Sequence, residues 1–103
     1  MKIDIAAERL IAAERGEEKI SGEIKSFISP SPISDFHAAL GQLLTYRLML
    51  EGREPDRLLY LAVPRDIYKT FFQSKLAQAA IKQHKLKMIV YNPKLEEIVQ
   101  WIE

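Results

Sequence analysis

Glu23 and Lys25 are the two side chains whose types and spacing best suit a chemical role. They lie two residues apart within residues 19–27, which we expect to form a β-strand, and alternate residues of a strand point to the same face. A carboxylate and an amine side by side suit metal-dependent hydrolysis of a phosphodiester. The Glu would hold a divalent cation, and the Lys would orient a water or stabilise charge on the phosphate. The alternative is an ordinary solvent-exposed charge pair.

The opposite face of this strand is apolar. Ile20, Ile24 and Gly22 alternate with the two charged residues. A strand that is charged on one face and apolar on the other normally packs its apolar face on the core. We therefore expect Ile20 and Ile24 to pack against a helix, and Glu23 and Lys25 to lie on the other face.

A metal ion would need a second carboxylate beside Glu23, and the sequence offers two. The chain begins with strand-like alternation and turns at Gly16-Glu17, which predicts a hairpin whose paired residue numbers sum to 33. In that register Glu8 lies opposite Lys25. Glu8 is then a diagonal neighbour of Glu23, about 7 Å away. Asp4 would lie about 20 Å along the strand from the residue that pairs with Glu23. Asp4 therefore joins the site only if the hairpin contains a bulge or an extra loop.

A long helix is predicted after the proline-containing loop at residues 28–33. Ser34 has a side chain typical of a helix N-cap. The helix should run to about Glu51, with Gly52 beyond its end and Pro55 stopping it. Leucines and a phenylalanine recur every four residues along it, which predicts one core-facing stripe.

The rest of the chain alternates between strands and helices. A nearly continuous apolar run at 57–63 is typical of a strand buried on both faces. The other expected elements are one broken helix or two short helices at 66–72 and 74–84, and strands at 86–91 and 96–102. The resulting order is β-β-α-β-α-β-β. It predicts an α/β fold with a mixed sheet, in which the long helix crosses over to a parallel neighbouring strand.

Composition limits the function classes. The 103 residues suit one domain, and the absence of cysteine excludes disulfides, thiolate metal sites and a cysteine nucleophile. No apolar run approaches the length of a membrane span, so we expect a cytoplasmic protein without membrane contact. The net charge of +1 gives no compositional argument for DNA binding, which would need a local patch. Lys82, Lys85 and Lys87 form a small basic run that can contact phosphate, although helix C-termini also attract lysine.

The predicted elements resemble the core of restriction endonucleases. An acid-bearing strand is followed by a strand with Glu-x-Lys, a helix and a buried strand, and phosphodiester hydrolysis needs Mg²⁺ held by carboxylate oxygens on rigid strands. Gln42 and Tyr46, one turn apart on the flank of the helix, resemble an accessory motif of one branch of these nucleases. The alternative for this pair is structural, with the tyrosine half-buried in packing.

The whole chain also resembles the XisH family, the fdxN-element excision controlling factors. The segments that carry the resemblance are LIAAERG (10–16), EIKSF (23–27), ALGQ (39–42), EPDR (54–57), LYLAVP (59–64) and IVQWI (98–102). These long literal matches are far more specific than Glu-x-Lys alone.

The resemblance implies a restriction-endonuclease-like fold and an accessory role in programmed excision of a DNA element. It implies DNA, a recombinase and a partner protein called XisI as associates, and it makes Asp4 the first acid of the site. The chain lacks the helix and further strand that usually open family members, so a single domain of residues 1–103 would be a shortened form. A sheet face left exposed by that difference favours a homodimer.

Two functions follow as expectations. The first is a Mg²⁺-dependent deoxyribonuclease with Asp4 or Glu8, Glu23 and Lys25 at its site, flanked by Gln42 and Tyr46. The second is a non-catalytic subunit that binds a partner protein and carries a vestigial nuclease site.

Overall fold

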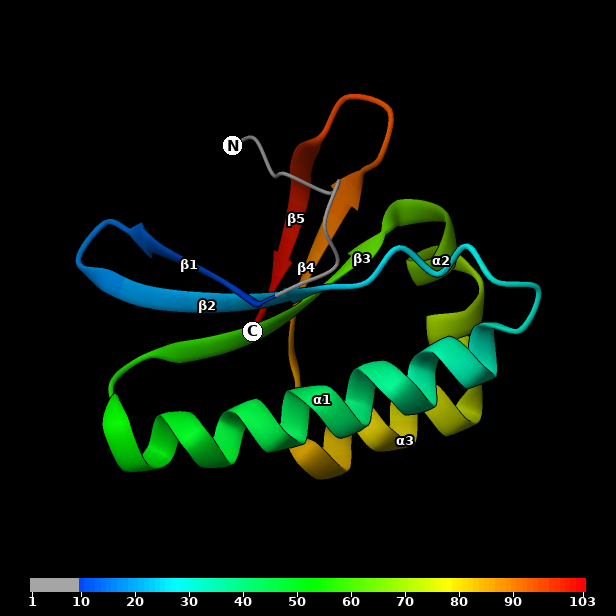
Figure 1. The fold of residues 1–103 in the computed structure, drawn as a ribbon. Helices are drawn as coiled ribbons and strands as arrows, with labels where there is room; N and C mark the ends of the chain where they lie inside the picture. Colours follow the sequence, from blue (N-terminus) through cyan, green and yellow to red (C-terminus); the bar gives the residue numbers. More distant parts are fainter. Residues whose placement is uncertain (1–9) are drawn as a thin grey trace.

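A five-stranded mixed sheet with helices on one side forms the protein, as the computed structural model shows for residues 10–103 (Figure 1). The strands lie in chain order, β1 to β5, across the sheet. The elements are β1 (Leu10–Arg15), β2 (Glu18–Ile24), α1 (Pro32–Arg53), β3 (Leu58–Pro64), α2 (Arg65–Lys69), a 3₁₀ turn (Phe71–Gln73), α3 (Lys75–His84), β4 (Lys87–Asn92) and β5 (Glu97–Ile102). The predicted mixed α/β class is confirmed. None of the helices in this part of the chain is long and apolar enough to cross a membrane.

The β1–β2 hairpin has the predicted register. Arg15 pairs with Glu18 and Leu10 pairs with Glu23, so the residue numbers sum to 33. Gly16 occupies the tight turn at φ +63°, a left-handed conformation that glycine adopts without steric cost. The two-residue turn fixes which residues of β1 lie beside Glu23.

Strands β2, β3 and β4 are parallel, because a helical segment crosses over between each consecutive pair. The central strand, β3, is buried along nearly its whole length, as its unbroken apolar sequence predicted. The predicted crossover of the long helix to a parallel neighbour is confirmed: α1 connects β2 to β3.

The N-cap of the long helix lies three residues earlier than predicted. Ser31, not Ser34, is the N-cap: its side chain accepts a hydrogen bond from the Ser34 backbone N–H at 3.3 Å. Pro32 then fits the first helical turn, where its fixed φ suits the helix and its missing N–H costs nothing. At the other end the helix continues past Gly52 to Arg53, because the Glu54 N–H still reaches the Leu50 carbonyl.

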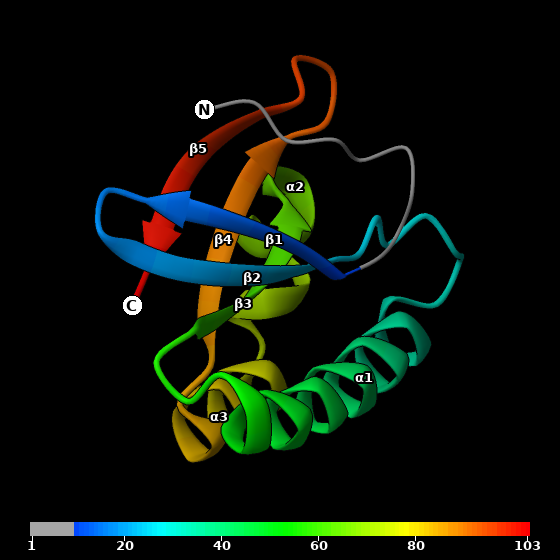
Figure 2. The same cartoon turned by 60° about the vertical axis from the view of Figure 1, so that its left-hand side comes forward.

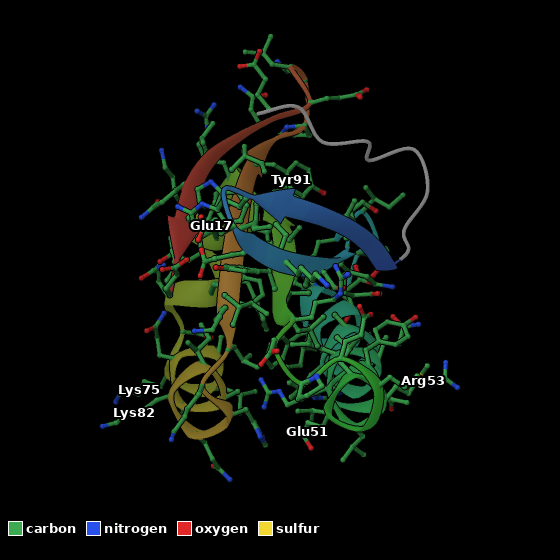
Figure 3. All side chains as sticks on the ribbon, turned by 90° about the vertical axis from the view of Figure 1, so that its left-hand side faces the viewer. Glu17, Glu51, Arg53, Lys75, Lys82 and Tyr91 are labelled. Carbon is green, nitrogen blue, oxygen red and sulfur yellow. The ribbon has the colours of Figure 1, made fainter. Side chains whose placement is uncertain are left out.

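The two faces of the sheet build two separate cores. Helices α1 and α3 lie side by side beneath one face (Figures 1 and 2), and the charged side chains labelled on them point away from the sheet (Figure 3). Buried residues of the helix-covered core are Phe27, Phe36, Ala39, Leu43, Leu59, Leu61, Val63, Phe72, Ala77, Leu86 and Met88. Those of the helix-free core are Ile20, Ile24, Tyr60, Ala62, Ile89 and Tyr91.

The expectation that Ile20 and Ile24 pack on a helix was wrong. Parallel pairing sets Ile24 beside Ala62 and Glu23 beside Leu61, so Ile24 joins the helix-free core and Glu23 lies on the helix-covered face. The sequence of one strand fixes which residues share a face. Which face the helices cover depends on the neighbouring strands, and both faces of β3 are apolar.

The sheet is curled so strongly that its two edge strands meet over the helix-free face. Arg15 of β1 lies 4.1 Å from the ring centroid of Trp101 in β5 and donates to the Glu103 side chain at 2.7 Å. Beneath them Trp101 packs edge-on against Tyr60, with ring centroids 5.2 Å apart. The contact of Arg15 with Trp101 joins β1 to β5, the strands that are furthest apart in sheet order (Figure 2).

The premise of the homodimer prediction therefore does not hold. We expected an apolar sheet face exposed to solvent, but each buried residue of the helix-free core is at most 4% exposed. The curl of the sheet is the physical reason within the described residues, because Trp101 and Arg15 cover the face from its two edges. The homodimer itself stays a prediction.

Candidate functional site

Glu23 is held on a rigid inner strand. Strand β2 pairs with β1 on one side and β3 on the other, so hydrogen bonds fix its backbone at both edges. The Glu23 side chain lies on the helix-covered face beside Leu61, and the residue is only 2% exposed. A carboxylate at this depth is stable only with a cation or hydrogen-bond donors around it. Glu23 is thus no ordinary solvent-exposed member of a surface charge pair.

Lys25 is fixed just beyond the last paired residue of β2. Its N–H donates to the Ala62 carbonyl at 3.0 Å, which continues the parallel ladder by one residue. Its carbonyl accepts a hydrogen bond from the Tyr91 hydroxyl at 3.2 Å, which reaches across β3 from β4. The Lys25 side chain is half-buried. Two strands therefore hold the backbone that carries this amine.

The two helical candidates differ in their surroundings. Tyr46 is half-buried and packs against the helix-covered core, whereas Gln42, one turn earlier on α1, is exposed. The packing of Tyr46 agrees with the alternative in which this tyrosine has a structural role. A role for Gln42 and Tyr46 in catalysis stays a prediction, because neither has a polar contact that ties it to Glu23 or Lys25 among the contacts that the structure records.

The second predicted carboxylate of the site is either Asp4 or Glu8. Asp4 and Glu8 lie outside the described residues, so the choice between them is untested. Among residues 10–103 no three His, Cys, Asp or Glu side chains are grouped closely enough to hold a metal ion. Of the predicted metal ligands, Glu23 is the one whose position the structure gives.

A mainly apolar pocket of about 310 Å³ opens next to Lys25, at the carboxyl ends of β2, β3 and β4. Open α/β sheets commonly bind ligands at this edge. The residues that line the pocket are Ser26, Phe27, Ile28, Pro64, Asp66, Ile67, Tyr91 and Pro93. Phe27 enters it with φ +54°. The positive φ turns the chain from β2 into the loop that leads to α1.

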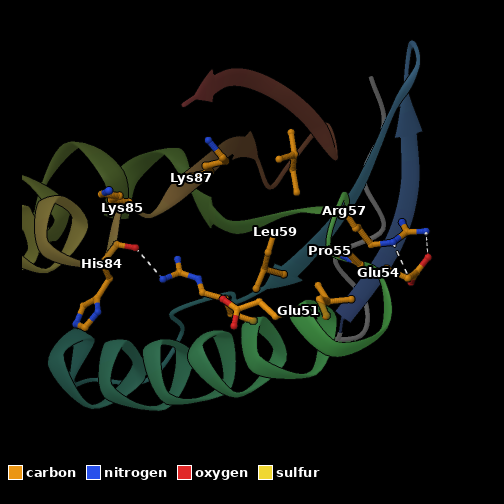
Figure 4. Close-up of a pocket in the computed structure, with 11 residues that line it drawn as sticks. Glu51, Glu54, Pro55, Arg57, Leu59, His84, Lys85 and Lys87 are labelled. Atoms are coloured by element: carbon orange, nitrogen blue, oxygen red, sulfur yellow. Dashed lines mark hydrogen bonds and ion pairs between the residues drawn. The ribbon is translucent and has the colours of Figure 1, made fainter.

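A second pocket, also of about 310 Å³, lies at the opposite end of the parallel strands, between the ends of α1 and α3 (Figure 4). Two of its charged residues, Arg47 and Arg57, form hydrogen bonds that connect elements of the fold. Arg47 donates to the His84 carbonyl at 2.8 Å at the end of α3. Arg57 binds both carboxylate oxygens of Glu54 and donates to the Ile20 carbonyl at 2.8 Å. Arg47 thus lies at the negative end of the α3 dipole, and Arg57 links Glu54, the C-cap residue of α1, to β2, so both have a structural role.

Sequence reasoning missed the polar group on the helix-free face. The buried Tyr60 hydroxyl donates to the Glu103 carboxylate at 2.5 Å. Burial, and then this hydrogen bond and the nearby charge, raise the pKa of Tyr60 to about 12. The Tyr60 hydrogen bond, followed by Arg15, lowers the pKa of Glu103. No spacing signal links these residues, because they come from β1, β3 and the end of the chain.

Comparisons with known proteins identify the family. The family model described as "XisH protein" matches residues 1–99. A crystal structure of an XisH family protein from Nostoc punctiforme PCC 73102 is 52% identical, with a TM-score of 0.86. A crystal structure of a fdxN element excision controlling factor protein from Anabaena variabilis is 53% identical, also with a TM-score of 0.86. Each alignment covers 91% of this chain and 74% of the crystallised one. No match was found among curated proteins. The chain belongs to the XisH family.

Proposed function

We propose that the protein acts in the programmed excision of a DNA element and hydrolyses DNA phosphodiester bonds at Glu23 and Lys25. The excision role is supported by the relative from Anabaena variabilis, a fdxN element excision controlling factor at 53% identity. The nuclease role rests on one observation. A carboxylate that is 2% exposed lies on a strand fixed at both edges, two residues before an anchored lysine. The restriction-endonuclease-like relationship of the fold is part of this proposal.

The residues present fit a magnesium ion by their donor chemistry. Mg²⁺ prefers carboxylate oxygens, and a buried carboxylate is stabilised by a cation beside it. Glu23 would hold the ion together with Asp4 or Glu8. The bound metal would activate water and polarise the phosphate. Lys25 would position the attacking water by hydrogen bonding and stabilise negative charge on the phosphate oxygens. Gln42 and Tyr46 would orient the DNA from α1.

The test is nicking of supercoiled plasmid in the presence of Mn²⁺. We expect cleavage by the wild type and none by Lys25→Ala or Glu23→Gln. Lys19→Ala is the matched control, because Lys19 is an exposed lysine of the same strand. Cleavage that survives in both site variants would show that the activity does not come from this strand.

Metal binding has an independent readout. A divalent ion at about ten times its Kd raises the free energy of unfolding by about 1.4 kcal/mol, through mass action. Mg²⁺ or Mn²⁺ should therefore raise the melting temperature of the wild type, and Glu23→Gln should remove that effect. An identical metal response in the two proteins would refute Glu23 as a ligand.

The second candidate function is a non-catalytic subunit that binds a partner protein. Large apolar side chains on the outer side of α1 favour it, since Leu48 is 71% exposed and Met49 48% exposed. The burial of Glu23 also suits a carboxylate that has a structural role and no catalytic one. The partner would be a second copy of this chain or an XisI-type protein. A folded protein with neither cleavage nor a metal response would favour this function.

A further inference from the structure

Positive charge is concentrated in one part of the chain. The sequence has 15 Lys and Arg and 14 Asp and Glu residues. Residues 67–95 contain six of the lysines and no carboxylate, so the remaining residues hold nine basic and 14 acidic side chains. A protein with a net charge of +1 therefore carries a strongly basic segment, which includes the whole of α3.

Helix α3 presents this charge to solvent. Lys75 and Lys82 are both exposed, and Figure 3 shows the two side chains pointing away from the body on the same side. Two full turns separate them, about 10 Å along the helix axis. Between them lie the exposed and uncharged Gln78 and Ala79, whereas Ala77 faces the core. Neither lysine forms a salt bridge with a described residue. We call Lys75, Gln78, Ala79 and Lys82 the α3 face.

Helix stability explains one of these lysines but not the other. Lys82 lies in the last turn of α3, where a cation interacts favourably with the negative end of the dipole. Lys75 is the first residue of the helix, beside the positive end, and the first turn contains no acid. A cation at that position destabilises the helix. Its place therefore suits a function outside the fold.

We propose that the α3 face binds the phosphate backbone of duplex DNA. Spaced lysines without carboxylates form the electrostatic footprint of a phosphate-binding surface. Protein–protein interfaces are instead depleted in lysine. The choice of DNA as the polyanion rests on the proposed function, but binding at this face requires neither a metal ion nor hydrolysis. The two lysines would fix the position of the duplex without reading its sequence.

The test is binding of a fluorescently labelled DNA duplex to the full chain in EDTA, measured by anisotropy over a series of salt concentrations. Lys75→Gln/Lys82→Gln removes two charges at exposed helical positions, where glutamine is about as good a helix former as lysine. We expect the slope of log K against log salt to become shallower by about 2, and affinity at low salt to fall by about 10-fold to 100-fold. The matched control, Lys19→Gln, also removes an exposed lysine, from a pocket lined by Glu17, Glu18 and Asp56. It should leave the slope unchanged.

Lys75→Glu separates binding from folding. An acid at the start of α3 should keep or raise the melting temperature, because it favours the helix dipole, while repelling phosphate and weakening binding. An unchanged salt slope in the double glutamine variant would overturn the inference, as would an equal loss in Lys19→Gln. If the wild type still cleaves plasmid, such a result leaves the proposed nuclease intact. A wild type that neither binds nor cleaves DNA would refute both.

Discussion

Tyr91→Phe tests whether the backbone of Lys25 is held from β4. The substitution removes the hydroxyl that donates to the Lys25 carbonyl at 3.2 Å and keeps the aromatic ring, which is fully buried in the helix-free core. One neutral hydrogen bond contributes about 1 kcal/mol to stability. For a domain of this size that corresponds to a decrease in melting temperature of about 4–8 °C. The ring packing should not change, so no cavity adds to the cost.

The assay is urea denaturation of wild type and variant. We expect the midpoint to fall with an unchanged m-value, because the surface exposed on unfolding stays the same. In the plasmid assay, cleavage should slow while DNA affinity stays at the wild-type value, since Lys25 keeps its charge but loses part of its support. An unchanged midpoint would refute the stabilising contact. A lower midpoint with full cleavage would show that this contact does not position Lys25.

Three further predictions concern the cap of α1 and the polar group on the helix-free face. Ser31→Ala should lower the free energy of unfolding by about 1 kcal/mol, and Ser34→Ala by clearly less, because Ser31 is the cap; denaturant midpoints will compare them. Tyr60 keeps its proton in the folded protein up to a pKa of about 12 against its usual 10.0, so its contribution to stability should fall as pH rises through this range. Tyr60→Phe should flatten that alkaline decrease in melting temperature. The pKa of Glu103 is lowered, so its contribution is present above the usual 4.5 and lost as pH falls. Glu103→Gln should weaken the decrease in melting temperature at acid pH. An equal decrease in the wild type and the variant would contradict this prediction.

Local patterns in the sequence predicted most elements of the fold. The hairpin register followed from a two-residue turn at Gly16, and the buried β3 followed from an unbroken apolar run. The predicted N-cap of α1, Ser34, was wrong, and the N-cap is Ser31. Both serines are equally good cap residues, and only the position of Pro32 in the first helical turn distinguishes them. Such a choice depends on loop geometry that residue preferences alone do not fix.

The candidate site was predicted less completely than the fold. The Glu-x-Lys spacing placed Glu23 and Lys25 on one strand. Glu23 lies in β2, but the strand ends at Ile24, and Lys25 follows it with one further hydrogen bond to β3. The sequence did not indicate that Glu23 would be buried while Lys25 would be half-buried. Burial depends on what packs over that face of the sheet. Helix α1 covers it through the crossover from β2 to β3, and the alternation of residues in β2 does not indicate on which side of the sheet that crossover lies.

The curl of the sheet changes what the burial of Glu23 means. Because the edge strands meet over the helix-free face, that face forms its own core around Tyr60, and no helix of residues 10–103 packs on this core. The helices cover the opposite face, which carries Glu23, and give the carboxylate rigid surroundings and little water. Such surroundings strengthen any electrostatic interaction the carboxylate makes. The pocket at the carboxyl ends of the parallel strands, next to Lys25, is where we expect substrate or metal to approach. A catalytic Glu23 therefore predicts access from the carboxyl ends of β2 and β3, and bulky substitutions at that edge should block cleavage while leaving the folded state intact.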